Sequence, residues 1–141
     1  MNFTSREEYG LLAVMHLAAG AGQGPIQSRE IARAEDIPEQ FLEQVLGALR
    51  RAGVVRSIRG AAGGYELARS AREITPGDVV RALSGEIMPA RAGARKPERA
   101  IVVDLWEKVQ KAISDVLDGM TIQDMVDERS RMQRNFVMMN I

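Results

Sequence analysis

The chain has 141 residues, of which 45% are hydrophobic, 4% are aromatic and none is cysteine, and its formal net charge is zero. This length allows one domain with an appended helical arm, whose core must be built from Leu, Val, Ile, Met and Ala. The lack of cysteine excludes disulfides, zinc–thiolate sites and cysteine-ligated clusters. Because no segment is long and apolar enough to span a membrane and no signal peptide is evident, we expect a cytoplasmic protein.

The N-terminal helix begins at two overlapping capping boxes within residues 4–8. Residues 9–19 are apolar almost all round, so this helix should be the buried, central one. The glycine-rich stretch 20–25 ends it and forms a loop. Ile26 follows and can pair as a short strand beside the hairpin described below.

Residues 28–51 predict a helix-turn-helix motif. The first helix starts with Ser28 as its N-cap, and residues 35–37 form the turn. Pro38 opens the second helix, because its fixed φ suits the first helical turn, and Gly53 stops that helix at the C′ position. The face of the second helix that should pack on the core carries Leu42, Val45, Leu46 and Leu49.

The opposite face of the second helix carries Gln40, Glu43, Gln44 and Gly47, spaced three and four residues apart. Gln can bond both N6 and N7 of adenine, and Glu can accept a hydrogen bond from N4 of cytosine. This face is therefore a candidate DNA-reading surface. For these residues alone, an ordinary solvated helix face is an equally good interpretation.

Two β-branched runs, residues 54–58 and 65–67, flank the glycine-rich loop 59–64 and predict a β-hairpin. Helix, turn, helix and hairpin together make a winged helix-turn-helix, a fold most often used to read DNA. The expected fold class is thus mostly α with a small β wing.

The wing carries the positive charge that the overall neutrality of the chain hides. Residues 50–72 contain six arginines against one acid. Arg59, next to Gly60, can enter a narrow minor groove, while Arg51 and Arg56 can reach phosphates. The glycines also fit a plain hairpin turn, and both interpretations can hold together.

After a polar connector, Thr75 caps a short helix that Gly85 ends. Residues 86–97 follow as a loop with positive charges and broken periodicity, which we expect to be a flexible linker. We therefore divide the chain into a DNA-binding domain (1–85), this basic loop (86–97) and a C-terminal part (98–141).

The longest helix signal covers about residues 98–117, with an apolar stripe at spacings of three and four. This rod of about 30 Å is too long to be buried wholly on so small a domain. The predicted partner is the same helix of a second subunit, and the alternative is packing along its own domain. A two-fold dimer would place two recognition helices roughly 34 Å apart, about one turn of DNA. A last helix starts at the capping box 121–124 and ends in the apolar segment 136–141.

These motifs resemble the bacterial family of winged-helix regulators that includes IscR, NsrR and CymR. The resemblance implies a dimeric repressor or activator of a partly palindromic operator, in which Glu43 reads a base in the major groove and Arg59 enters the minor groove. The wing differs slightly from the family pattern, with Ala61-Ala62 where a proline and a glycine are usual. The segments that carry the resemblance are Thr4-Ser5, Phe41-Leu42-Glu43-Gln44, Ser57-Ile58-Arg59-Gly60, Gly63-Gly64-Tyr65 and Gly77-Asp78-Val79.

The part of the chain that corresponds to the cluster-binding sensor of this family differs more from the family pattern. Cluster-binding members place three cysteines in the part that corresponds to residues 87–97 and the start of the long helix, where this chain has none. One cluster-binding variant draws an acid and a histidine from the first helix. Glu8 matches the acid, but Leu12 stands in place of the histidine, and His16 one turn later is better explained as a core residue. We therefore expect no cofactor and no metal, and sensing without a cysteine-ligated cluster.

The C-terminal tail suggests a second route of regulation. CymR-like members are controlled through a complex with cysteine synthase, and Asn140-Ile141 resembles the tail that serine acetyltransferase inserts into that enzyme's active site. A tail packed on its own dimer is at least as good an interpretation. Catalysis is not expected, since the single histidine has no acid cluster and no nucleotide-binding fingerprint is present.

Overall fold

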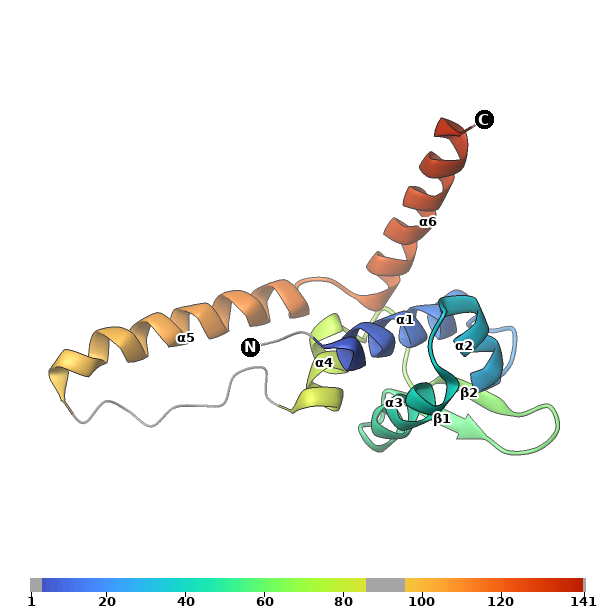
Figure 1. The fold of residues 1–141 in the computed structure, drawn as a ribbon, viewed down its shortest axis with the longest axis horizontal. Coiled ribbons are helices and arrows are strands. Elements are labelled where there is room, and N and C mark those ends of the chain that lie inside the picture. The colour runs from blue at the N-terminus through green and yellow to red at the C-terminus, as the bar shows by residue number, and fades with distance from the viewer. Residues whose placement is uncertain (1–3, 86–95, 141) are drawn as a thin grey trace.

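The computed structural model describes residues 4–85 and 96–140 (Figure 1). In these ranges the chain is mostly helical, with one small antiparallel sheet, as the sequence predicted. The elements in chain order are α1 (Ser5–Ala19), α2 (Ser28–Glu35), α3 (Glu39–Arg51), β1 (Val55–Ile58), β2 (Gly64–Leu67), α4 (Pro76–Ser84), α5 (Pro97–Asp118) and α6 (Ile122–Met139).

Helix α1 is the centre of the fold, as its apolar composition predicted. It packs against α2, α3, α4, α6 and β2. Ala13 and Val14 are fully buried at its middle. The N-terminus of α1 carries the expected capping box, in which the Thr4 backbone N–H donates to Glu7 Oε2 at 2.8 Å. This central position fixes the helix-turn-helix and the C-terminal arm against one common core.

The helix-turn-helix forms as predicted, although two of its caps differ. Gln27, not Ser28, is the N-cap of α2, and Ser28 is the first helical residue. The Ser28 hydroxyl does not turn back to a backbone N–H, because it donates to the Glu43 carboxylate instead. Pro38 is the N-cap of α3 and lies one residue before the helix. Gly53 has a φ of +76°, which agrees with its predicted role after the end of α3.

The wing is a hairpin in which Val55 faces Leu67 and Ile58 faces Gly64. Its strands are one residue off the predicted bounds, because Val54 lies outside β1 and Gly64 lies inside β2. Ile26 forms the expected isolated bridge with Tyr65, with N···O distances of 2.9 and 2.8 Å. A Cβ on Gly64 would come within 2.5 Å of the Ile26 backbone, so only glycine permits this close approach.

The capping boxes predicted at Thr75 and at Thr121 are both present. Arg81 of α4 holds the end of α5 through Asp118, with Nη2···Oδ1 at 2.7 Å and Nη1···Oδ2 at 3.1 Å. Ile122, the first residue of α6, is fully buried in the core formed by α1 and its neighbours. The predicted linker falls largely on residues 86–95, outside the described residues.

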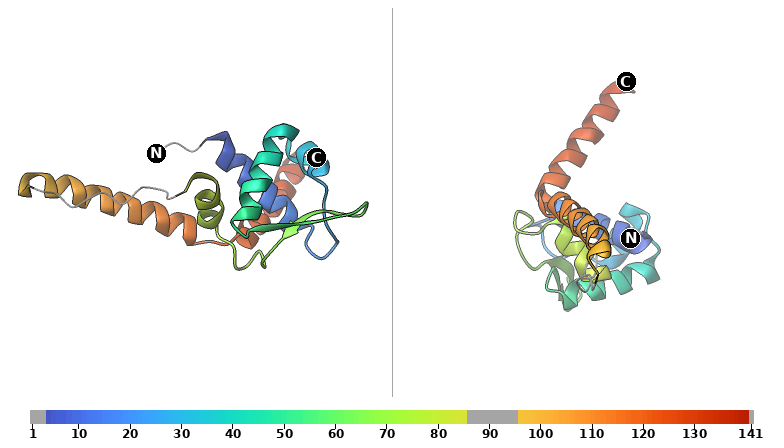
Figure 2. Two further views of the ribbon diagram at one scale, coloured as in Figure 1. Left: turned by 90° about the horizontal axis from the view of Figure 1, so that it is seen from below. Right: turned by 90° about the vertical axis from the view of Figure 1, so that its left-hand side faces the viewer.

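Helices α5 and α6 leave the compact part of the molecule in different directions (Figures 1 and 2). Figure 1 shows α6 rising on the side of α1 opposite to α3 and the wing, and the views in Figure 2 agree. The fold therefore separates a surface built by α3 and the wing from a C-terminal arm. None of the described helices is long and apolar enough to cross a membrane.

Candidate nucleic-acid interface

Helix α3 has one buried and one exposed face, as its periodicity predicted. Leu42, Val45, Leu46 and Leu49 are each fully buried. Gln40, Glu43 and Gln44 are exposed together on the other side. Arg51, at the end of α3, is on this face too, because its Nη1 would lie 3.4 Å from a Cβ built at Gly47. The structure thus brings four of the predicted residues onto one uncovered surface.

Within this surface, Glu43 is held by a neighbouring helix. The Ser28 hydroxyl of α2 donates a hydrogen bond of 2.6 Å to Glu43 Oε1. In the described part of the chain, neither Gln40 nor Gln44 has a hydrogen-bond partner for its side chain. The sequence did not predict this hydrogen bond, because Ser28 was interpreted only as a local helix cap.

The wing turn lies beside the start of the helix-turn-helix. Arg59 and Gly60 are both exposed in this turn, and Gly60 has a φ of +112°, which favours glycine. A groove of about 260 Å³ separates the turn from the first residues of α2 and α3. It is lined by Gln27, Ser28, Arg29, Glu39, Gly60, Gly63, Gly64 and Tyr65.

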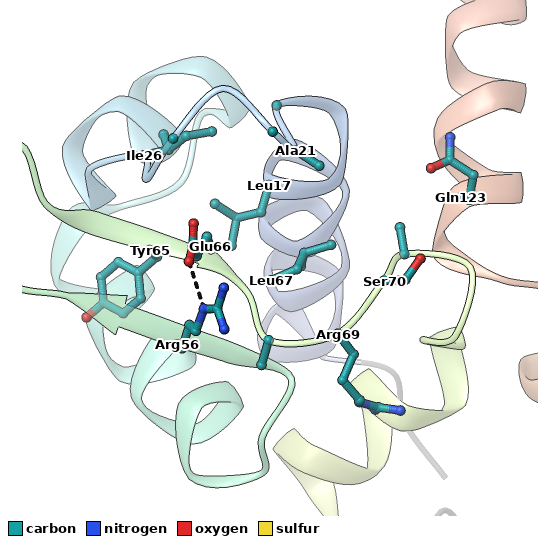
Figure 3. A pocket seen from close by; sticks show the side chains of 15 residues that line it. Leu17, Ala21, Ile26, Arg56, Tyr65, Glu66, Leu67, Arg69, Ser70 and Gln123 are labelled. Carbon is teal, nitrogen blue, oxygen red and sulfur yellow. Dashed lines mark hydrogen bonds and ion pairs between the residues drawn. The ribbon is translucent and has the colours of Figure 1, made fainter.

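Arg56 differs from the other predicted arginines, because an acid already engages it. Its Nε lies 2.7 Å from Oε1 of Glu66, its direct partner across the hairpin. Both residues line a pocket of about 500 Å³ between the wing, the loop after α1 and the start of α6 (Figure 3). Figure 3 shows this ion pair in the pocket, with Leu17 of α1 above it in this view. A phosphate contact by Arg56 would therefore compete with Glu66.

The predicted partner-binding tail lies far from α3 and the wing. Asn140 is the C-cap of α6, and its Nδ2 donates to the Phe136 carbonyl at 2.8 Å. Ile141 lies outside the described residues. The last turns of α6 are apolar and exposed, with Phe136 at 69% and Met139 at 85%.

A helix-turn-helix with an uncovered polar face, next to an arginine-bearing hairpin turn, defines a winged-helix DNA-binding regulator. The sequence profile of the Rrf2 family, described as "Iron-dependent Transcriptional regulator", matches residues 3–128. The chain belongs to this family. The resemblance to IscR- and CymR-like proteins is thereby confirmed, and so is the expectation that the chain is not an enzyme, since its relatives are named as regulators.

The similarity to individual relatives extends over most of the chain. CymR of Bacillus subtilis is 38% identical over 125 residues, which cover 89% of each protein. The structure described as CymR (YrzC), "the Global Cysteine Regulator of B. subtilis", superposes with a TM-score of 0.80 at 37% identity, covering 91% of this chain and 98% of that one. IscR of T. potens has a TM-score of 0.78 at 37% identity, covering 94% of this chain and 91% of the other.

The family description names iron, but the side chains in the part of the chain that the structure describes do not fit an iron site. The chain has no cysteine. The residues in the two described ranges include no group of three or more His, Cys, Asp and Glu side chains that could hold a metal. His16, the one histidine, has its Nδ1 3.0 Å from Glu35 Oε2, and the same carboxylate is also bound by Arg129 of α6. His16 and Glu35 are thus engaged in joining helices.

Proposed function

We propose that this chain forms a homodimer that represses transcription in the cytoplasm by binding a partly palindromic operator in double-stranded DNA. Residues 1–85 bind the DNA, residues 98–141 hold the two subunits together, and residues 86–97 connect these parts. Membership of the regulator family does not by itself fix the number of subunits, repression as opposed to activation, or the residues that contact DNA.

The observation that carries the proposal is the uncovered face of α3 beside the exposed wing turn. In the proposal, Gln40, Glu43 and Gln44 enter the major groove and read base edges. Arg59 and Gly60 enter the adjacent minor groove. Arg51 and Arg56 contact phosphates, with the Arg56 contact weakened by Glu66.

The state of α5 supports the homodimer. This helix has 22 residues, none of which is buried, and is about 33 Å long. Several of its apolar side chains are exposed, with Ile101 at 70%, Leu105 at 53% and Val116 at 71%. Burial against the same helix of a second subunit would remove this apolar surface from water. The two-fold axis would then give two DNA-reading surfaces for two half-sites.

The proposal includes sensing without a cysteine-ligated iron–sulfur cluster, since this chain has no cysteine. The description of the similar B. subtilis structure as a global cysteine regulator favours operators in front of genes of cysteine metabolism.

The proposal is tested by selecting binding sites for the purified protein from a library of random DNA duplexes. We expect an inverted repeat whose half-sites are roughly one helical turn apart. Light scattering should then find two subunits on each selected duplex, and the selected site placed in a promoter should lower transcription in vitro. No enriched sequence would contradict operator binding, a single half-site bound by one subunit would contradict the dimer, and raised transcription would contradict repression.

A second candidate function is control by a protein partner, cysteine synthase, through the C-terminal tail. It is favoured by the exposed apolar end of α6, including Met138 at 72% and Met139 at 85%. Removal of Asn140 and Ile141 should abolish binding to purified cysteine synthase and leave binding to the selected operator intact. If the shortened chain binds the enzyme as the full chain does, or if neither binds it, the tail is not the contact.

A further inference from the structure

We propose that Ser28 is a specificity-determining residue that acts by positioning Glu43. Its hydroxyl holds the Glu43 carboxylate at the edge of the DNA-reading face, so that base preference depends on a residue of α2 as well as on α3. The inference rests on the proposed function, because it concerns how the same surface selects its operator.

The geometry of the contact is that of a strong, charge-assisted hydrogen bond. The distance from Ser28 Oγ to Glu43 Oε1 is 2.6 Å, within the range of about 2.5–2.7 Å expected for a hydroxyl that donates to a carboxylate. No other hydrogen bond to the Glu43 carboxylate is found among the described residues. Oε2 is therefore left to accept a hydrogen bond from a base.

The fold makes this contact rigid. Ser28 is the first residue of α2 and Glu43 lies one turn into α3, and the two helices pack against each other. Their inner faces are fixed by fully buried Ile31 and Leu42. A carboxylate beside the first residue of α2 also lies at the positive end of that helix's dipole. The Glu43 side chain is thus ordered before DNA arrives.

Prior ordering matters because of the flexibility of glutamate. A free Glu side chain loses rotamer entropy when it is fixed on binding. It can also avoid a base that repels it by turning towards solvent. Guanine and thymine present acceptor oxygens in the major groove, whereas cytosine presents a donor. With Ser28 in place, Glu43 cannot move away without breaking its hydrogen bond, so an acceptor at this position is rejected.

The test uses the operator that the wild-type protein selects from random duplexes, and a set of duplexes that carry each of the four base pairs at each position. Binding is measured by fluorescence anisotropy for the wild type and for S28A, S28T, E43A and the double variant S28A/E43A. The variant S114A, which removes a serine hydroxyl from α5, is the matched control. Circular dichroism and urea unfolding confirm that each variant is folded.

We expect E43A to identify the position that Glu43 reads. At that position S28A should lower the preference for the correct base pair about three- to tenfold, mainly because binding to the disfavoured bases becomes tighter. S28T, which keeps the hydroxyl, and S114A should behave as the wild type. S28A should have no further effect in the E43A background.

Three results would overturn the inference while leaving the proposed function standing. S28A could keep full discrimination while E43A loses it, S28A could weaken all duplexes equally as loss of a phosphate contact would, or S28A could act at a different position from E43A. A wild-type protein that selects no sequence would instead overturn the proposed function and this inference with it.

Discussion

Arg129 of α6 and Glu35 of α2 form a two-point ion pair, with Nη1···Oε1 at 2.9 Å and Nη2···Oε2 at 3.4 Å. His16 of α1 lies 3.0 Å from the same Oε2. Glu35 is the last residue of α2, so it stands at the turn of the helix-turn-helix, and its side chain is only 11% exposed. One carboxylate therefore joins the central helix, the DNA-binding motif and the C-terminal arm.

We predict that R129A lowers the free energy of unfolding by about 1–3 kcal/mol, because it removes one partner from a largely buried carboxylate. Urea denaturation followed by far-UV circular dichroism measures this change. The control is R131A on the same helix, whose partner Glu128 is 50% exposed. That variant should lose less stability than R129A, because an ion pair between exposed side chains contributes little. Equal small losses in both variants would mean that the contact with Glu35 contributes no more than a surface pair.

Glu7 makes the stability of the fold depend on pH in the acid range. Burial works to raise its pKa, but hydrogen bonds from the Ser84 and Thr4 hydroxyls and from the Thr4 backbone outweigh burial, and the pKa lies below the ordinary value of 4.5. A carboxyl whose pKa is lower in the folded than in the unfolded chain stabilises the fold above the unfolded value. This stabilisation is lost as the pH falls through the folded value.

We therefore predict that E7Q is less stable than the wild type at pH 7 by about 1–3 kcal/mol, and that the difference shrinks as the pH falls below about 4.5. Urea unfolding at a series of pH values measures both effects. E8Q, which changes the exposed next residue, should stay within about 0.5 kcal/mol of the wild type at pH 7. A difference between E7Q and the wild type that is constant with pH would mean that the charge of Glu7 has no part in it.

The sequence was sufficient to predict the elements that depend on local rules. The capping boxes at Thr4, Thr75 and Thr121 begin the helices that they predicted. The periodicity of α3 separated its buried leucines from the exposed Glu43. These features depend on residues three or four positions apart, so each can be recognised without knowing the rest of the fold.

What the sequence could not supply were contacts between residues far apart in the chain. Ser28 fits the local rule for a helix cap, yet Glu43, fifteen residues away, offers its hydroxyl a charged acceptor. The local arginine count identified a basic wing, but the register that places Glu66 opposite Arg56 is a property of the folded hairpin. The same is true of Glu35 and Arg129, which are 94 residues apart.

The proposed dimer predicts an effect of charge on one face of α5. L105K places a lysine among the exposed apolar residues and should shift the protein from dimer to monomer in light scattering. E107K, on the other side of the helix, is the control and should remain dimeric. Trp106, the only tryptophan, should emit at longer wavelength in the L105K monomer, because dissociation exposes it to water. A dimeric L105K protein would place the subunit contact elsewhere.

For the wing, we predict that R59A binds the selected operator about tenfold more weakly and that the slope of log K against log salt concentration falls by about 0.9 for each subunit bound. Arg59 is exposed in the turn and carries a charge that would release counterions from the groove. R59K separates charge from shape, since it should keep the salt slope but lose preference for a narrow, A·T-rich minor groove. The control is R134A on α6, on the side of the molecule away from the wing, which should leave both affinity and slope unchanged (Figure 1). An unchanged slope in R59A would place Arg59 outside the DNA contact, because a charge within the groove cannot be removed without altering counterion release.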